Sequence, residues 1–177
     1  MNLVILDRDG VINLDSEHYI KSPEEWKPIP GSLEAIARLT QAGFRVVVAT
    51  NQSGLGRGLF DMATLNAMHD KMHKAVNQLG GRIDAVFFCP HAQNAGCACR
   101  KPQPGMLLEI AERFNVALAG VPAIGDSLRD LQAASAAGAK PILVLTGKGE
   151  QTLESGLLPE GTEVHQDLAA AALALAA

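Results

Sequence analysis

Short apolar runs alternate along the chain with segments that have helical spacing. The apolar runs are residues 3–6, 46–49, 85–88, 121–124 and 141–145, and the helical segments between them are 32–41, 63–79, 105–114 and 128–137. A run that is apolar at nearly every position predicts a strand buried on both faces. Gly43 and Gly138 stand where two of these helices should end. The alternation predicts an α/β fold, a doubly wound and mainly parallel sheet with helices on both faces.

Composition and charge narrow the class of protein. Of the 177 residues 47% are hydrophobic but only 4% aromatic, so an aliphatic core is expected. A net charge of −4 argues against nucleic acid as a partner, yet leaves room for a small anionic ligand. No apolar stretch approaches the ~18 residues of a membrane span, and no export signal is evident. We therefore expect one cytoplasmic, monomeric domain over residues 1–177 with no membrane partner, ending in an alanine-rich helix at 169–177.

Chemically versatile residues follow each of the first four predicted strands. They are Asp7 and Asp9 after the first, Thr50 and Asn51 after the second, Cys89 and His91 after the third, and Asp126 after the fourth. In doubly wound sheets, ligands bind beyond the carboxyl ends of the strands. Four separate loops are therefore expected to converge on one site.

The first of these loops reads Asp7-Arg8-Asp9-Gly10. In an extended chain residues i and i+2 share a face, so the two carboxylates can point to one site, and Gly10 allows a sharp turn. Two adjacent acids repel each other unless a cation neutralises them or one stays protonated. A magnesium ion on one acid and proton transfer by the other would use this arrangement. Taken alone, however, the motif fits a solvated turn equally well.

Three further residues turn this pair into a site for a phosphoryl group. Thr50 offers a hydroxyl in a glycine-rich loop, which suits a phosphate oxygen. Lys101, between Arg100 and Pro102, supplies a positive charge, and Asp126 supplies another hard oxygen ligand for magnesium.

The order of these residues resembles the haloacid dehalogenase superfamily of phosphatases. Its four motifs match Asp7-Arg8-Asp9, Thr50, Lys101 and Gly125-Asp126-Ser127-Leu128-Arg129-Asp130, and the resemblance spans roughly residues 3–145. The resemblance implies that Asp7 is the nucleophile and forms an aspartyl-phosphate, while Asp9 handles the proton. It also implies that Thr50 and Lys101 hold the phosphoryl oxygens. Magnesium would be bound by Asp7, Asp126 and the backbone carbonyl of Asp9.

A second cluster contains every cysteine of the chain. Cys89, His91, Cys97 and Cys99 lie within eleven residues and form a complete tetrahedral set for zinc. A closed set of four ligands indicates a structural ion that pins the zinc loop, residues 89–99, next to Arg100. The alternative is a group of unpaired buried cysteines beside an incidental histidine. The expected cofactors are thus a catalytic Mg²⁺ and a structural Zn²⁺.

The pattern Cys-x-His followed by Cys-x-Cys-Arg-Lys-Pro is similar to one branch of the superfamily, which contains heptose bisphosphate phosphatases and histidinol phosphatases. The heptose group fits better, because histidinol phosphatases of this branch tend to have Asp where Ser53 stands. This resemblance implies a sugar bisphosphate substrate, whose 7-phosphate is removed. It places Asp15, Tyr19, Asn51, Gln52, Ser53 and Arg100 in contact with that substrate. Ser127 departs from the heptose pattern, in which a lysine is common.

Several signals carry less weight. His69 and His73 lie four residues apart on a predicted helix, but the glutamate of a zinc-protease motif is missing, which favours a surface helix face. Arg57 is either a second phosphate ligand or a solvated loop residue, and His18 and Trp26 either line the pocket or pack a loop. The intervals between the motifs are too short for a large cap domain, so an open site is expected.

Three other functions remain open at this point. Histidinol-phosphate phosphatase is the nearest alternative, followed by a broad phosphatase for sugar phosphates or nucleotides. The third is a zinc-stabilised binding module that has kept the fold without catalysis. The joint presence of Asp7, Asp9, Lys101 and Asp126 argues against this last function.

Overall fold

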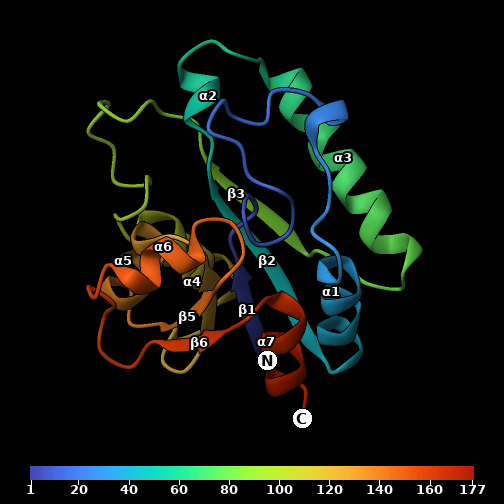
Figure 1. Cartoon of the computed structure of the whole chain (residues 1–177), viewed down its shortest axis with the longest axis vertical. Coiled ribbons are helices and arrows are strands. Elements are labelled where there is room, and N and C mark those ends of the chain that lie inside the picture. The colour runs from blue at the N-terminus through green and yellow to red at the C-terminus, as the bar shows by residue number, and fades with distance from the viewer.

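A computed structural model describes all residues 1–177, and its centre is a single six-stranded sheet (Figure 1). The strands are β1 (Asn2–Leu6), β2 (Phe44–Asn51), β3 (Ala85–Cys89), β4 (Pro122–Gly125), β5 (Lys140–Val144) and β6 (Glu163–His165). They lie in the order β3-β2-β1-β4-β5-β6, and every neighbouring pair is parallel. The predicted doubly wound sheet is confirmed, and its strand order reverses between β1 and β4.

Helices cover both faces of the sheet (Figure 1). They are α1 (Ser32–Gln41), α2 (Ser53–Gly56), α3 (Met62–Gln78), α4 (Gly105–Phe114), α5 (Leu128–Ala136), α6 (Gly149–Glu154) and α7 (Leu168–Leu175), with a short 3-10 helix at Pro23–Glu25. Every predicted strand and helix begins and ends within two residues of its expected position. The unpredicted elements α2, α6 and β6 have four, six and three residues, too few to reveal a hydrophobic period.

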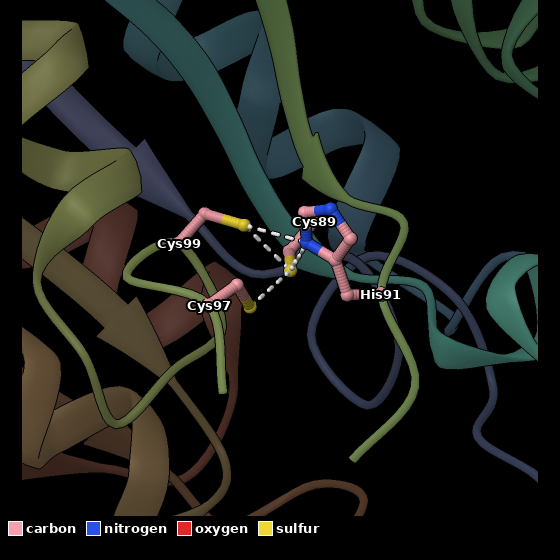
Figure 2. Close-up of side chains that lie close together, drawn as sticks. All are labelled: Cys89, His91, Cys97 and Cys99. Atoms are coloured by element: carbon pink, nitrogen blue, oxygen red, sulfur yellow. Dashed lines mark hydrogen bonds between the residues drawn. The ribbon is translucent and has the colours of Figure 1, made fainter. Parts of the chain in front are cut away.

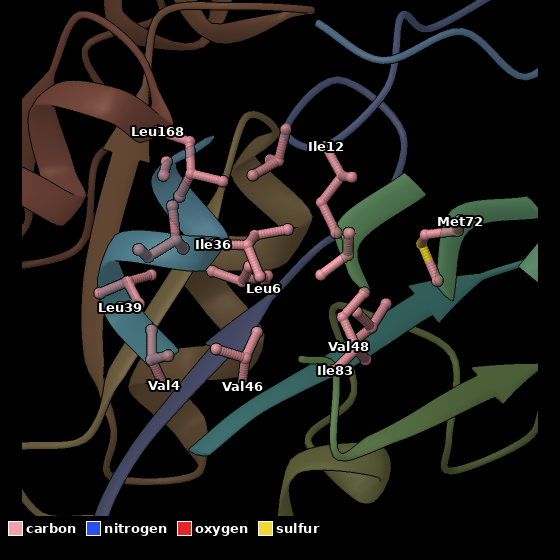
Figure 3. Close-up of a cluster of buried hydrophobic side chains, with 14 of the residues drawn as sticks. Val4, Leu6, Ile12, Ile36, Leu39, Val46, Val48, Met72, Ile83 and Leu168 are labelled. Carbon is pink, nitrogen blue, oxygen red and sulfur yellow. The ribbon is translucent and has the colours of Figure 1, made fainter. Parts of the chain in front are cut away.

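The core consists of two hydrophobic clusters, one on each face of the sheet. Successive residues of β1 alternate between them, so Val4 and Leu6 face one cluster and Leu3 and Ile5 the other. The first cluster packs β1 and β2 against α1, α3 and α7, and Figure 3 shows its labelled members Val4, Leu6, Ile12, Ile36, Leu39, Val46, Val48, Met72, Ile83 and Leu168. The second packs the sheet against α4 and α5. Burial on both faces explains why the strands are continuously apolar.

The loops at the carboxyl ends of β1, β4 and β5 are tied closely together. The Asp7 amide donates to the Ile124 carbonyl at 2.9 Å, and the Thr146 hydroxyl donates to the Gly10 carbonyl at 2.7 Å. Gly10 has a φ of +85°, and a Cβ there would collide with the Asp126 carboxylate. Gly10 therefore permits both the turn after Asp9 and the close approach of the loop that carries Asp126.

No large cap domain covers these loops, as expected. Trp26 is fully buried in the first cluster, so it belongs to the core. None of the helices combines the length and the apolar character that a crossing of the bilayer requires.

Candidate active site

A polar cavity of about 280 Å³ opens at the carboxyl edge of the sheet. Only two of its 19 lining residues are hydrophobic, so it suits a charged or highly hydroxylated small molecule. Its lining includes every residue that the sequence assigned to catalysis, magnesium or substrate: Asp7, Asp9, Asp15, Tyr19, Thr50, Asn51, Gln52, Ser53, Arg100, Lys101 and Asp126. The structure thus brings these residues together, while their individual roles stay predictions. His18, Trp26 and Arg57 do not line the cavity.

Lys101 lies at the base of this cavity and is only 4% exposed. Its Nζ is 2.9 Å from Asp7 Oδ1 and 2.7 Å from Asp130 Oδ1, and it donates to the Ala49 carbonyl at 2.8 Å. Burial alone would lower the pKa of Lys101, but the two carboxylates raise it above its ordinary value. With three acceptors around it, the ammonium is a fixed positive charge in a partly dehydrated site.

Three carboxylates surround this single ammonium. Oxygen atoms of Asp7, Asp126 and Asp130 lie within 4.8 Å of one another. Burial, together with the charge of Asp130, raises the pKa of Asp7 to about 7 and that of Asp126 to about 9. For Asp130, burial acts in the same direction, but the charge and hydrogen bond of Lys101 hold its pKa below the ordinary value. Asp7 shares the single ammonium with Asp130, and Asp126 has no cation beside it, so the cluster carries uncompensated negative charge, as expected of ligands for a hard divalent ion such as Mg²⁺.

The motif after β4 is built as the first turn of α5. Ser127 caps the helix by accepting from the Asp130 amide at 3.4 Å, so its hydroxyl is used within the fold. Asp130 Oδ2 accepts from the amides of Asp126 and Ser127, both at 3.1 Å. Asp126 Oδ2 in turn accepts from the Lys148 amide at 2.9 Å. These bonds fix the orientation of both acids and leave Asp126 Oδ1 available to a metal.

Asp9 stands apart from the three clustered carboxylates. Its Oδ1 accepts from Arg8 Nε at 2.8 Å and from Asn13 Nδ2 at 2.9 Å. Its Oδ2 accepts only the longer bond, 3.3 Å, from Gln52 Nε2. One oxygen of Asp9 is thus engaged, and the other remains accessible for proton transfer.

The carboxyl end of β2 and Gln52, which follows it, support both Lys101 and Asp9. Asn51 binds the backbone of Lys101 twice, donating to its carbonyl at 3.1 Å and accepting from its amide at 3.0 Å. Gln52 Nε2 donates to the hydroxyl of buried Thr50 at 3.0 Å. Asn51 therefore positions the lysine through its backbone, and its contact with a substrate stays a prediction.

A rim of side chains connects three loops at the mouth of the cavity. Gln93, in the zinc loop, donates to the Tyr19 hydroxyl at 3.1 Å and accepts from Arg57 Nε at 2.9 Å. The guanidinium of Arg57 also lies 5.8 Å from the centre of the Tyr19 ring. Arg57 thus contacts Tyr19 at the rim. Because it does not line the cavity, the structure does not support its predicted role as a second phosphate ligand.

Sequence reasoning missed several residues of the lining. Lys148 follows β5 in the segment Thr146-Gly147-Lys148-Gly149 and lines the cavity with Arg129 and Gln93. The strand-end rule would have found Lys148 had it been applied to the fifth strand as well as to the first four. Asp130 is part of the fourth motif in the sequence, but the spacing of the motifs does not predict its ion pair with Lys101.

The predicted zinc ligands form a compact cluster at the end of β3 (Figure 2). His91 Nδ1 lies 3.4 Å from Cys89 Sγ and 3.3 Å from Cys99 Sγ, and Cys89 Sγ lies 3.5 Å from Cys97 Sγ. Burial and the neighbouring thiols raise the pKa of Cys99 to about 12. Burial opposes ionisation of Cys97 too, but the Arg100 amide and the surrounding donors bring its pKa to about 6. The three thiols can all be ionised together only around a cation. Three sulfurs with one imidazole fit tetrahedral zinc.

Two family models match the sequence. The model described as HAD-hydrolase-like matches residues 98–171, and the model described as polynucleotide kinase 3 phosphatase matches residues 2–127. The second covers the first three motifs and the start of the fourth.

Curated relatives align over nearly the whole chain. D-glycero-β-D-manno-heptose-1,7-bisphosphate 7-phosphatase of Bordetella bronchiseptica is 67% identical over 97% of this chain and 96% of its own. The enzyme of the same name from Pseudomonas putida is 57% identical over 97% of this chain and 98% of its own. The crystal structure of D,D-heptose 1,7-bisphosphate phosphatase from B. bronchiseptica, complexed with magnesium and phosphate, superimposes with a TM-score of 0.98 at 66% identity, covering 99% of this chain and 98% of that one.

Replacing Lys101 by methionine tests the electrostatic core of the site. Removal of the ammonium leaves Asp7 and Asp130 buried without a cation, so the free energy of unfolding should fall by about 3 kcal/mol near pH 7. The native ion pair lowers the pKa of Asp130 below 3.8 and so stabilises the fold above that pH. This contribution is intact down to about pH 4, so the part of the variant's deficit that it causes should shrink only as the pH falls below 3.8. Urea unfolding in buffer without magnesium measures both effects.

The control is Lys148→Met, since this lysine is half exposed and its nearest carboxylate, on Asp15, is 3.8 Å away. Its free energy of unfolding should change by no more than about 0.5 kcal/mol. Equal effects of the two substitutions would contradict the assignment of Lys101 as the cation of the buried carboxylates.

Proposed function

This chain belongs to the D-glycero-β-D-manno-heptose-1,7-bisphosphate 7-phosphatase family of the haloacid-dehalogenase-like hydrolases, and we propose that it removes the 7-phosphate of D-glycero-D-manno-heptose 1,7-bisphosphate in a magnesium-dependent reaction. As a member of that family it is a phosphomonoester hydrolase. The observation that carries the proposal is the cluster of three carboxylates, on Asp7, Asp126 and Asp130, around the single fixed ammonium of Lys101. This arrangement complements a metal-bound phosphoryl group.

Asp7 is the nucleophile in this proposal. Its Oδ1 is held by Lys101, which leaves Oδ2 to attack phosphorus. The bond from phosphorus to the sugar oxygen breaks as the aspartyl-phosphate forms, and Asp9 gives its proton to the leaving oxygen. Asp9 then takes a proton from the water that attacks the aspartyl-phosphate. Inorganic phosphate leaves, and the carboxylate of Asp7 is restored with Asp9 protonated again.

The residues around the nucleophile supply positioning and charge. In this proposal Lys101 and the hydroxyl of Thr50 hold phosphoryl oxygens, and both residues line the cavity while being almost fully buried. Asp7 and Asp126 would hold the magnesium ion, with the Asp9 carbonyl as the third protein ligand. When bound, the ion neutralises the carboxylates and the charge of the phosphoryl group. The related enzyme from B. bronchiseptica binds magnesium and phosphate, which supports this assignment.

Arg100 is our candidate for the phosphate that is not cleaved. Its Nη1 is buried without a hydrogen-bond partner, and burial beside the like charge of Arg129 lowers its pKa. A second anionic group would supply the missing hydrogen-bond acceptor and offset the repulsion between Arg100 and Arg129. A guanidinium can bind phosphate through two hydrogen bonds. A bisphosphate therefore fits the cavity better than a substrate with a single phosphate.

We further propose that the cluster on residues 89–99 binds one structural zinc ion. The loop leads directly into Arg100 and Lys101, and its Gln93 contacts the rim of the cavity. The ion would therefore order both the base and the mouth of the site. Free thiols at such a site require a reducing compartment, which supports a cytoplasmic location. The product, a heptose 1-phosphate, would be suited to nucleotide activation for surface glycans.

Asp7→Asn tests the nucleophile. Turnover of the heptose bisphosphate should fall by at least about 10⁴-fold, because an amide cannot form the covalent intermediate. The fold should persist, since the substitution removes one of three crowded acids. Phosphate release and circular dichroism measure the two effects, and Asp70→Asn on the exposed side of α3 is the control. Near-normal turnover in Asp7→Asn would overturn the mechanism.

A comparison of substrates tests the specificity. With magnesium present, kcat/KM for heptose 1,7-bisphosphate should exceed that for heptose 7-phosphate and for histidinol phosphate by about 100-fold. Arg100→Met should close most of the gap between the two heptose substrates by raising KM for the bisphosphate. Preferred turnover of histidinol phosphate would favour that alternative function, and equal turnover of all three would indicate a broad phosphatase.

Removal of zinc tests the role of the loop. Elemental analysis should find one zinc per chain, and Cys97→Ser should lose it. Loss of the zinc should lower the free energy of unfolding by about 2 kcal/mol, which in a chain of this size lowers the melting temperature by about 4–8 °C. Turnover should fall as well, and zinc rather than magnesium should restore the stripped enzyme. Unchanged melting temperature and turnover after stripping would refute the proposal.

A further inference from the structure

Arg8 is a fully buried arginine between two residues of the active site. It stands between Asp7 and Asp9 in the sequence, and the proposed mechanism assigns no role to Arg8. A buried guanidinium is unfavourable unless its donors find acceptors. Its partners therefore indicate what the residue does.

Two contacts account for the position of this guanidinium. Nε donates to Asp9 Oδ1 at 2.8 Å, and Nη2 lies at the same distance from that oxygen without forming a hydrogen bond. On the opposite side, Nη1 lies 3.1 Å from Nε2 of His69, in the middle of α3. Arginine cannot accept a hydrogen bond, so His69 must accept through an unprotonated Nε2 and carry its proton on Nδ1.

The surroundings keep His69 in this neutral form. The side chain is only 8% exposed, and burial, followed by the charge of Arg8, lowers its pKa to about 3. The expectation of a surface helix face is therefore wrong for His69, whereas His73, one turn later, is half-buried and makes no hydrogen bond to Arg8. The helical spacing of the two histidines does not make them a pair, because only the first reaches the active-site loop.

The contacts at Asp9 show what this arrangement accomplishes. Oδ1 is held by Arg8 and by the buried amide of Asn13, while Oδ2 accepts a single bond of 3.3 Å from Gln52. The carboxylate is thus fixed through one oxygen and free at the other. An arginine side chain has several rotatable bonds, so a contact at its far end helps to keep Nε in place against Oδ1.

We propose that His69 is a positioning residue for the phosphatase reaction, anchoring Arg8 so that Arg8 holds Oδ1 of Asp9 and Oδ2 alone carries the proton in both steps. This inference rests on the proposed function, in which Asp9 is the general acid and base. His69 touches neither substrate nor metal, and its effect reaches the reaction through Arg8.

Two substitutions, His69→Gln and His69→Asn, both keep a hydrogen-bond acceptor at this position but place it at different distances along the side chain. The amide oxygen of His69→Gln can occupy the place of Nε2, whereas that of His69→Asn reaches only the place of Nδ1. In His69→Asn, kcat for the heptose bisphosphate should fall by about 10-fold to 100-fold with KM within about twofold, because misplaced general acid–base groups slow chemistry without weakening binding. His69→Gln should recover most of the loss. His73→Asn, on the same helix, should behave as wild type.

A change of leaving group distinguishes misplacement of Asp9 from general damage to the site. The leaving group of p-nitrophenyl phosphate departs without a proton, so formation of the aspartyl-phosphate from it should be slowed no more than about threefold in His69→Asn. Breakdown of the aspartyl-phosphate, which needs Asp9 as base, should be slowed with either substrate. Rapid-quench measurement of phosphoenzyme formation and decay, with magnesium saturating, gives both rates.

The outcomes separate this inference from the proposed function. If the wild-type enzyme releases no phosphate from the heptose bisphosphate, the proposed function fails. If the wild type is active and His69→Asn matches it, or loses rate equally in formation and decay with both substrates, the positioning role is overturned. It is also overturned if His69→Gln loses as much as His69→Asn. Should His69→Asn fail to fold, His69→Leu provides the same test with the same expected results.

Discussion

The repulsion among three buried carboxylates, relieved by one buried ammonium, is the constraint on which the rest of this structure depends. Asp7 and Asp126 are brought together because β1 and β4 are neighbours at the point where the strand order reverses, and Asp130 joins them from the first turn of α5. A parallel sheet places these acids close together but supplies no cation. The fold supplies one by bringing Lys101 from the loop after β3, and the negative charge that remains is what the proposed metal would neutralise.

Placement of that lysine explains several features that would otherwise seem unrelated. Lys101 lies on a loop, where an unsupported side chain would be mobile. Asn51 holds its backbone through two hydrogen bonds, and the proposed zinc site closes the loop immediately before it. Gln93 of the same loop reaches Tyr19 at the opposite rim. The base and the mouth of the cavity are thus held by one loop, so a metal remote from the reacting atoms can affect both.

The sequence predicted the sheet and the place of the site, because both follow from local patterns. Strands buried on two faces are continuously apolar, and parallel strands bring their carboxyl ends to one edge. The role of His69 could not be predicted, because helical period tells which residues share a face but not what covers that face. Asp130 was recognised as part of a motif, whereas its ion pair with Lys101 depends on loop geometry that spacing does not encode. The short elements α2, α6 and β6 lack enough residues to show any period.

The two acids of the first loop receive different tasks from different surroundings. Asp7 lies among acids, and burial together with the charge of Asp130 raises its pKa to about 7, so a further cation beside Lys101 would favour the ionised nucleophile. Asp9, two residues away, is bound by an arginine and by neutral amides, and it lies outside the carboxylate cluster. In the proposed mechanism a metal at Asp7 and Asp126 therefore activates the nucleophile without occupying the proton carrier. In that mechanism magnesium dependence follows from the crowding of the carboxylates, and the different roles of Asp7 and Asp9 follow from Arg8, whose side chain contacts the carboxylate of Asp9 but not that of Asp7.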